Sequence, residues 1–79
     1  MITPTVGRVV WFYRDGVQHA AIIAKVWNDR MVNLAVFDEA GRASNQTSVP
    51  LVQEGDTIPS GSYYAVWMPF QIGQAKKES

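Results

Sequence analysis

The chain of 79 residues contains no cysteine, one histidine and no uninterrupted apolar run of the roughly 18 residues that cross a membrane. Without cysteine it can form neither a disulfide framework nor a thiolate zinc site, which suits a reducing cytoplasm. Seven Lys and Arg residues balance seven Asp and Glu residues, so the broad electrostatic attraction to nucleic acid or membranes is missing. The first ten residues also lack the charged and apolar segments of an export signal. We therefore expect a cytoplasmic protein whose partners include no long nucleic acid and no membrane.

Few residues are available for catalysis or metal binding. His19 has no cysteine partner and no carboxylate at metal-ligand spacing, so a partly buried or surface histidine is predicted. The pair Asp38 and Glu39 adjoins a turn glycine and is interpreted as a solvated corner. Gly55 and Gly61 do not form a phosphate-binding loop with a helix behind it. The sequence thus predicts a protein that is not an enzyme, with no catalytic residue, cofactor or metal site.

What the chain does contain is a series of short apolar runs, rich in β-branched and aromatic residues and separated by turn residues. The runs QHAAIIAKVW and VNLAVFD flank Asn28-Asp29-Arg30 and predict a central β-hairpin. Asp15-Gly16 predicts a tight turn before it, and Pro50 is expected to end the fourth strand. The predicted strands cover residues 5–14, 17–27, 31–37, 43–49 and 62–67.

Five short strands joined by turns, without a helical period, predict an all-β fold. We expect a small antiparallel meander of five strands closed into an SH3-like barrel, because closure removes exposed strand edges. An open sheet completed by a second subunit is the alternative. Residues 1–70 are predicted to form a single domain, and residues 71–79 a disordered tail with nothing to bury.

The alternation of side chains along a strand predicts which face of the hairpin is buried. In the third strand, Val32, Leu34 and Val36 are assigned to the core. In the second strand, the core is assigned to Ala20, Ile22, Ala24 and Val26, and the opposite face to His19, Ala21, Ile23, Lys25 and Trp27. The first strand carries large apolar groups on both faces. One small monomer can hardly cover both, so we predict a homo-oligomer.

Aromatic and polar side chains on these strands form the predicted ligand-binding set. Its members are Arg8, Trp11, Trp27, Asn33, Thr47, Ser48 and Tyr64. A planar ligand could stack on the aromatics for about 1–3 kcal/mol per base, and an arginine could hold its phosphate. The hydroxyls of Thr47 and Ser48 could grip a phosphate or bond across strands. The aromatics also suit an ordinary core and subunit interface, so both interpretations stay open.

The succession TVGRVVWFY, AAIIAKVW, VNLAVFD and TSV, followed by an aromatic and proline ending, resembles a group of small phage and prophage proteins. The similarity covers residues 5–69, and the segment YYAVWMP stands where that group has a shorter Trp-rich stretch. The resemblance implies a phage source and a small accessory protein of the host cytoplasm. Some small phage proteins counter bacterial immunity by sequestering cyclic nucleotide signals of the host.

Two functional hypotheses follow. In the first, a non-enzymatic homo-oligomer binds a nucleotide-derived signal in a pocket at a subunit interface and sequesters it. In the second, an SH3-like module uses the same aromatic face to bind a host or phage protein.

Overall fold

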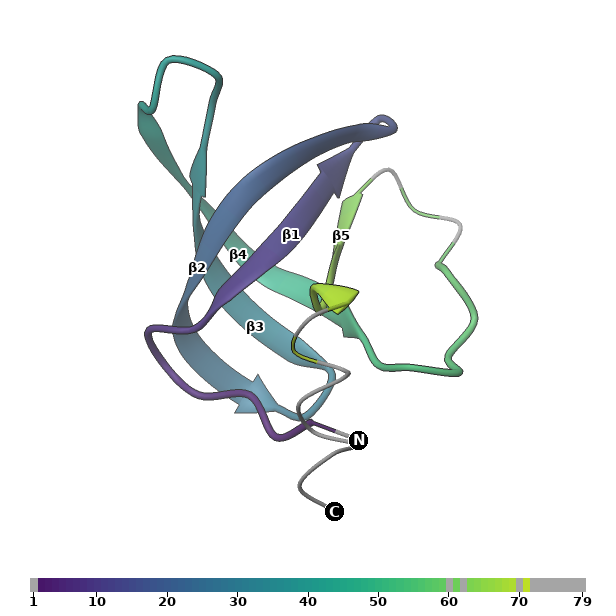
Figure 1. Cartoon of the computed structure of the whole chain (residues 1–79). Coiled ribbons are helices and arrows are strands. Elements are labelled where there is room, and N and C mark those ends of the chain that lie inside the picture. The colour runs from purple at the N-terminus through teal and green to yellow at the C-terminus, as the bar shows by residue number, and fades with distance from the viewer. Residues whose placement is uncertain (1, 60, 62, 70, 72–79) are drawn as a thin grey trace.

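Five strands form a closed barrel in the computed structural model, which describes residues 2–59, 61, 63–69 and 71 (Figure 1). The strands are β1 (Val9–Arg14), β2 (Val17–Asn28), β3 (Met31–Phe37), β4 (Ala43–Val52) and β5 (Tyr63–Val66). Each strand pairs with the next one along the chain, and β5 returns to pair with β1. The predicted all-β fold and its closure are confirmed. Apart from Gln71, the predicted tail lies outside the described residues.

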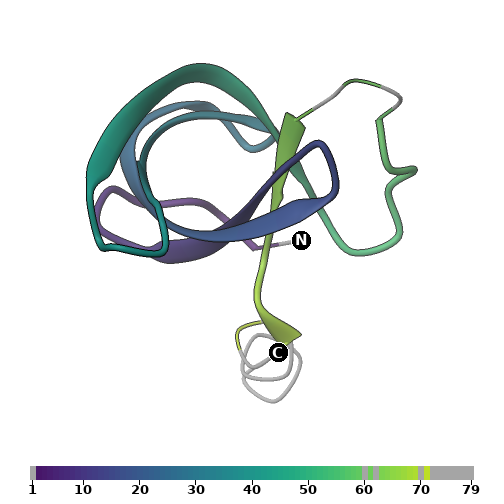
Figure 2. The same cartoon turned by 90° about the horizontal axis from the view of Figure 1, so that it is seen from above.

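One pair of neighbouring strands is parallel, so the prediction of a wholly antiparallel barrel is wrong. Strand β5 runs antiparallel to β1 and parallel to β4. Strand directions can alternate all the way round a closed ring only when the number of strands is even. With five strands, one parallel pair is unavoidable, and a parallel pair needs a crossover connection. The connection from β4 to β5 makes this crossover outside the ring of strands (Figure 2). No helix in the described part of the chain is long and apolar enough to cross a membrane.

Two strand boundaries differ from the prediction by more than one residue. Strand β1 begins at Val9, four residues later than expected, because Gly7 has a φ of 94° and bends the chain before the strand. Strand β4 continues through Pro50, which was expected to end it. The next residue, Leu51, donates its N–H to the carbonyl of Arg30 at 3.0 Å. Pro50 therefore occupies the non-hydrogen-bonded position of the ladder, where no N–H is needed.

The core lies inside the barrel and includes side chains from all five strands. It comprises Val10, Phe12, Ala21, Ile23, Val32, Leu34, Val36, Val49, Leu51, Ala65 and Trp67. The predicted core face of β3 is confirmed, whereas that of β2 is wrong. Ala21 and Ile23 are buried, Ala20 and Ala24 are exposed, and Ile22 is half-buried.

A β-bulge explains the error in β2. The pair Ile23–Leu34 is followed by Lys25–Asn33, so Ala24 is an extra residue in β2. The extra residue shifts the alternation by one position, and Val26 packs against the core although Ile22 and Ala24 face outward.

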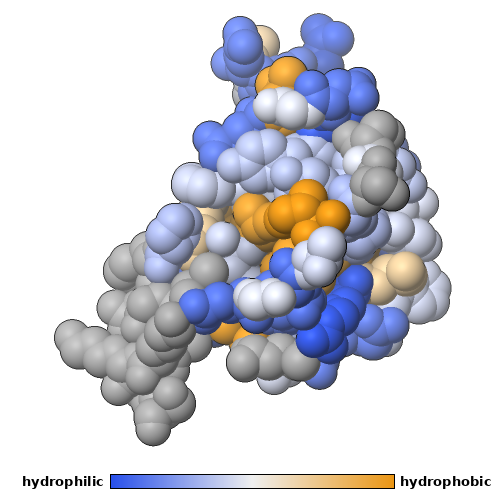
Figure 3. All heavy atoms as spheres, turned by 90° about the vertical axis from the view of Figure 1, so that its right-hand side faces the viewer, coloured by the Kyte–Doolittle hydropathy of each residue, from blue (hydrophilic) through white to orange (hydrophobic). Residues whose placement is uncertain are grey.

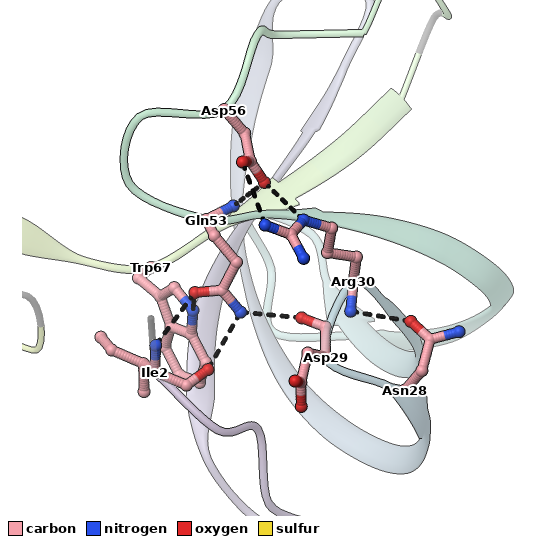
Figure 4. A network of polar contacts seen from close by, with 7 residues as sticks. All are labelled: Ile2, Asn28, Asp29, Arg30, Gln53, Asp56 and Trp67. Carbon is pink, nitrogen blue, oxygen red and sulfur yellow. Dashed lines mark hydrogen bonds and ion pairs between the residues drawn. The ribbon is translucent and has the colours of Figure 1, made fainter.

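Gln53 closes one end of the barrel through a buried hydrogen-bond network (Figure 4). Its Nε2 donates to the carbonyls of Ile2 at 2.9 Å and Asp29 at 2.7 Å. Its Oε1 accepts from the N–H of Ile2 and from the indole Nε1 of Trp67, both at 3.1 Å. The amide thereby joins the N-terminal segment, the β2–β3 turn and the residue that follows β5.

An ion pair extends this network to the surface. The carboxylate of Asp56 accepts from Arg30 Nε at 2.9 Å and from Arg30 Nη2 at 3.3 Å. It also accepts from the backbone N–H of Gln53 at 3.0 Å. The hydrogen bond from Arg30, followed by that from Gln53, lowers the pKa of Asp56 below its ordinary value.

We expect Asp56→Asn to reduce the acid sensitivity of the fold. Because the pKa of Asp56 is lower in the folded chain, the unfolded chain takes up the proton first as the pH falls. The stabilisation by the Asp56 carboxylate is complete above the unfolded pKa of about 4 and is lost as the pH drops through the lower folded pKa. The melting temperatures of the variant and the parent protein should therefore approach each other as the pH is lowered from about 6 to about 3, which thermal melts at several pH values would measure.

Glu39→Gln is the matched control, since Glu39 is an exposed carboxylate of the β3–β4 turn. It should retain the acid sensitivity of the parent. Equal acid sensitivity of Asp56→Asn and Glu39→Gln would show that the ion pair does not govern this pH dependence.

Candidate functional site

Asn33 lies in β3 between two β-bulges. Toward β2 it pairs with Lys25, immediately after the extra residue Ala24. Toward β4, the pairs Val32–Val49 and Leu34–Gln46 leave the single residue Asn33 opposite two residues, Thr47 and Ser48. Bulges interrupt the pairing of strands and change the direction of side chains, and they occur often next to functional sites.

Both bulges direct polar side chains outward. Regular alternation from the buried Ile23 would turn Lys25 into the core, but the extra residue leaves Lys25 exposed. In β4, Thr47 and Ser48 are both exposed although they are consecutive. Side chains from three neighbouring strands are thereby presented on one outer surface.

The side chain of Asn33 holds this surface together. Its Oδ1 accepts from the indole Nε1 of Trp27 at 2.9 Å and from the backbone N–H of Ser48 at 2.8 Å. Ser48 has a φ of 54°, a left-handed conformation that is uncommon for residues other than glycine. Asn33 was predicted to contact a ligand. The structure gives its oxygen a structural task, so Asn33→Ala would disturb the bulge as well as any binding.

Trp27 offers its flat ring to the solvent. Its side chain is 52% exposed, and the Nζ of Lys25 lies 3.6 Å from the ring centroid. This is a cation–π contact, to which an indole ring is the best suited of the aromatic side chains. Since the indole N–H is bonded to Asn33, Trp27 can contact a further molecule mainly through the faces and edges of its ring.

The three strands that carry these residues hold charge of one sign only. Strands β2, β3 and β4 contain no Asp or Glu, and Lys25 is their single charged residue. Thr47, Ser48 and the Nδ2 of Asn33 add hydrogen-bond donors. We call the set of Lys25, Trp27, Asn33, Thr47 and Ser48 the bulge surface. Its combination of a cation, donors and an aromatic ring suits an anionic group attached to a planar ring.

The other three predicted site residues lie elsewhere. The guanidinium of Arg8 sits 5.7 Å from the ring centroid of the buried Trp67. Trp11 is half-buried on the outer face of β1. Tyr64 of β5 stacks on Tyr13 of β1, with centroids 5.3 Å apart and an interplanar angle of 19°. The structure therefore unites four of the seven predicted residues, namely Trp27, Asn33, Thr47 and Ser48.

Lys25 belongs to the bulge surface but was not among the predicted site residues. The alternation of the sequence placed it on the outer face and gave it no role. Lys25 could have been recognised from the sequence because it is the one charged side chain in β2, β3 and β4.

The remaining polar candidates have structural surroundings. His19 is half-buried, with its ring centroid 6.3 Å from that of Phe12. Asp38 Oδ1 accepts from the backbone N–H groups of Ala40 at 2.9 Å and Arg42 at 2.8 Å, which shapes the β3–β4 turn. Among the described residues, no group of three or more His, Asp or Glu could hold a metal ion.

The fold and the bulge surface define a small all-β barrel with an aromatic, donor-rich outer face. Comparison of the chain with protein-family models, curated proteins and solved structures yields no match. Its function must therefore be argued from the chemistry of its surface.

Proposed function

We propose that this protein is a non-enzymatic homo-oligomer, built from SH3-like barrels, that binds and sequesters a small nucleotide-derived ligand. A cyclic nucleotide signal of host immunity is the ligand class that we favour. Encoded by a phage, as its resemblance to small phage proteins implies, such a protein would act in the host cytoplasm and lower the free concentration of that signal.

The bulge surface is the observation that carries this proposal. A nucleotide combines a planar base with an anionic phosphate. The exposed ring of Trp27 can stack on a base, which is worth about 1–3 kcal/mol and tolerates any base. The phosphate would meet the ammonium of Lys25 on strands that carry no competing carboxylate.

The outer face of β1 and β2 supports the homo-oligomer. Val9 is 39% exposed, Trp11 and Ile22 are half-buried, and Ala20 is exposed. These side chains point away from the core that the monomer already fills. A second copy would cover them, and burial of such an apolar area is the usual driving force of association. Trp11 is thereby assigned to the subunit contact.

A second function is favoured by a different face. Ile58, in the connection from β4 to β5, is 52% exposed, and Tyr63 at the start of β5 is 39% exposed. On this side of the molecule an apolar area is surrounded by hydrophilic side chains (Figure 3). Such an area also suits a protein–protein contact, so the alternative is an interaction module for a host or phage protein.

Size-exclusion chromatography with light scattering and ultraviolet detection tests the proposal. We expect a mass that is a multiple of 8.8 kDa, with excess nucleobase absorbance when the protein is purified from cells that make cyclic nucleotide signals. Denaturation should release the nucleotide, and adding it back should raise the melting temperature.

Trp27→Ala should remove the excess absorbance, whereas Tyr63→Ala, which changes the other exposed aromatic face, should retain it. A nucleotide-free spectrum, together with no thermal shift from a panel of cyclic nucleotides, would reject the sequestration function. A mass of 8.8 kDa at every dilution would reject the homo-oligomer.

A further inference from the structure

Ser48 holds an unfavourable backbone conformation in the middle of the bulge surface. Its φ of 54° lies in the left-handed region, although it is neither glycine nor part of a turn between elements. Such a conformation persists only where the surroundings enforce it, here through the 2.8 Å bond from its N–H to Asn33. Conformations of this kind are concentrated at active sites and ligand-binding sites.

The bulge brings hydrogen-bond donors together. Both Thr47 and Ser48 are exposed on the outer face, and within the described part of the chain neither hydroxyl has a hydrogen-bond partner. The Oδ1 of Asn33 accepts two bonds, which fixes the carboxamide and leaves its Nδ2 as a free donor among the described residues. Two hydroxyls and one amide can thus donate to the same acceptor group.

We propose that the Thr47–Ser48 bulge is a phosphate-binding site. The hydroxyls of Thr47 and Ser48 and the Nδ2 of Asn33 donate to the phosphate oxygens. This assignment rests on the proposed nucleotide binding and adds to it the part of the ligand that each residue contacts.

Lys25 completes the site, because its ammonium can move from the ring of Trp27 to the bound phosphate. Its ammonium lies 3.6 Å from the Trp27 ring centroid, and it forms no ion pair with a described residue. A phosphate at the bulge attracts this ammonium more strongly than the ring does, because a full opposite charge outweighs the quadrupole of an aromatic ring. When Lys25 turns to the phosphate, the ring face that it covered becomes free for the base.

Nitrogen-15 NMR of the full chain, titrated with inorganic phosphate, adenosine and a cyclic adenine dinucleotide, tests this assignment. Inorganic phosphate should shift the side-chain amide of Asn33 and the backbone amide of Ser48. The dinucleotide should shift the same signals and the indole signal of Trp27, with at least about tenfold tighter binding from its base contacts. Adenosine, which lacks phosphate, should bind more weakly than the dinucleotide by a similar factor.

Three variants separate binding from folding. Thr47→Val and Lys25→Gln should each weaken dinucleotide binding by at least about tenfold without lowering the melting temperature by more than a few degrees. Ser48→Gly should raise the melting temperature by several degrees, roughly 4–8 °C per kcal/mol of strain removed, and still weaken binding. Arg42→Gln, which removes a cation from the β3–β4 turn, is the control and should bind as the parent does.

The outcomes distinguish this inference from the proposed function. If the dinucleotide binds but shifts only signals outside the bulge surface, the sequestration function stands and the phosphate site is rejected. If phosphate and dinucleotide shift the bulge signals with equal affinity, the phosphate site stands and the nucleotide ligand is rejected. If no probe shifts Asn33 or Ser48, or if the three variants all bind as Arg42→Gln does, the phosphate site is wrong.

Discussion

Ile23→Ala is expected to lower the free energy of unfolding by about 2–5 kcal/mol, whereas Ile22→Ala in the isolated monomer should lower it by less than about 1 kcal/mol. Ile23 is 1% exposed inside the barrel, so its truncation removes buried methyl groups and leaves a cavity. Ile22 is half-buried on the outer face, where solvent or neighbouring side chains can occupy the vacated space.

Urea denaturation at several protein concentrations separates the two effects. The loss in Ile23→Ala should be the same at every concentration, because the barrel core belongs to one subunit. If Ile22 lies in a subunit contact, the loss in Ile22→Ala should grow as the concentration rises and the oligomer becomes populated. A larger loss for Ile22→Ala at the lowest concentration would show that the assignment of the two faces of β2 is reversed.

Ile22 and Ile23 also show why the inner face of β2 could not be predicted from the sequence. Along AAIIAKV, both alternating sets are apolar, so the periodicity does not distinguish the inner from the outer face. The extra residue Ala24 then shifts the phase within the strand, and alanine carries no signal for a bulge. In β3, by contrast, Asn33 interrupts one of the two sets, which left Val32, Leu34 and Val36 as the core face and made the prediction correct.

The first two hairpin turns were predictable for local reasons. Asp15-Gly16 and Asn28-Asp29-Arg30 fixed two hairpins through their turn chemistry alone. The parallel pair of β4 and β5 was not predicted, although five strands cannot alternate in direction around a closed ring. Pro50 misled the prediction because its effect depends on which side of the ladder the missing N–H faces, and that depends on register.

The candidate site was predicted in part because the hydroxyls of Thr47 and Ser48 adjoin an apolar run and could bind a phosphate. That Thr47 and Ser48 lie beside Asn33 and Trp27 depends on the register of β2, β3 and β4, which could not be predicted from the sequence. Arg8 was predicted to hold a phosphate, yet its guanidinium lies over the ring of the buried Trp67. Trp11 and Tyr64 lie away from the bulge surface, so the aromatic character of a residue did not by itself identify Trp27 as the aromatic member of the site.

Gln53→Leu is expected to destabilise the fold by at least about 3 kcal/mol, with about 1–3 kcal/mol for each buried polar group left unpaired. Leucine fills a similar volume but can neither donate to the carbonyls of Ile2 and Asp29 nor accept from the indole N–H of Trp67. Trp67 is 2% exposed, so water cannot readily replace the lost partner. A domain of this size has only about 4–12 kcal/mol of stability, so a large part of the margin would be lost.

Gln46→Leu provides a control with the same chemical change. Gln46 is half-buried in β4, and no hydrogen bond of its side chain to another described residue is present. Its replacement should change the free energy of unfolding by no more than about 0.5 kcal/mol. Urea denaturation followed by tryptophan fluorescence measures both variants, since the surroundings of Trp67 report on the closed end of the barrel. Equal stability of the two variants would mean that the hydrogen bonds of Gln53 do not hold the N-terminal segment and the β2–β3 turn together, and that packing of the core closes this end unaided.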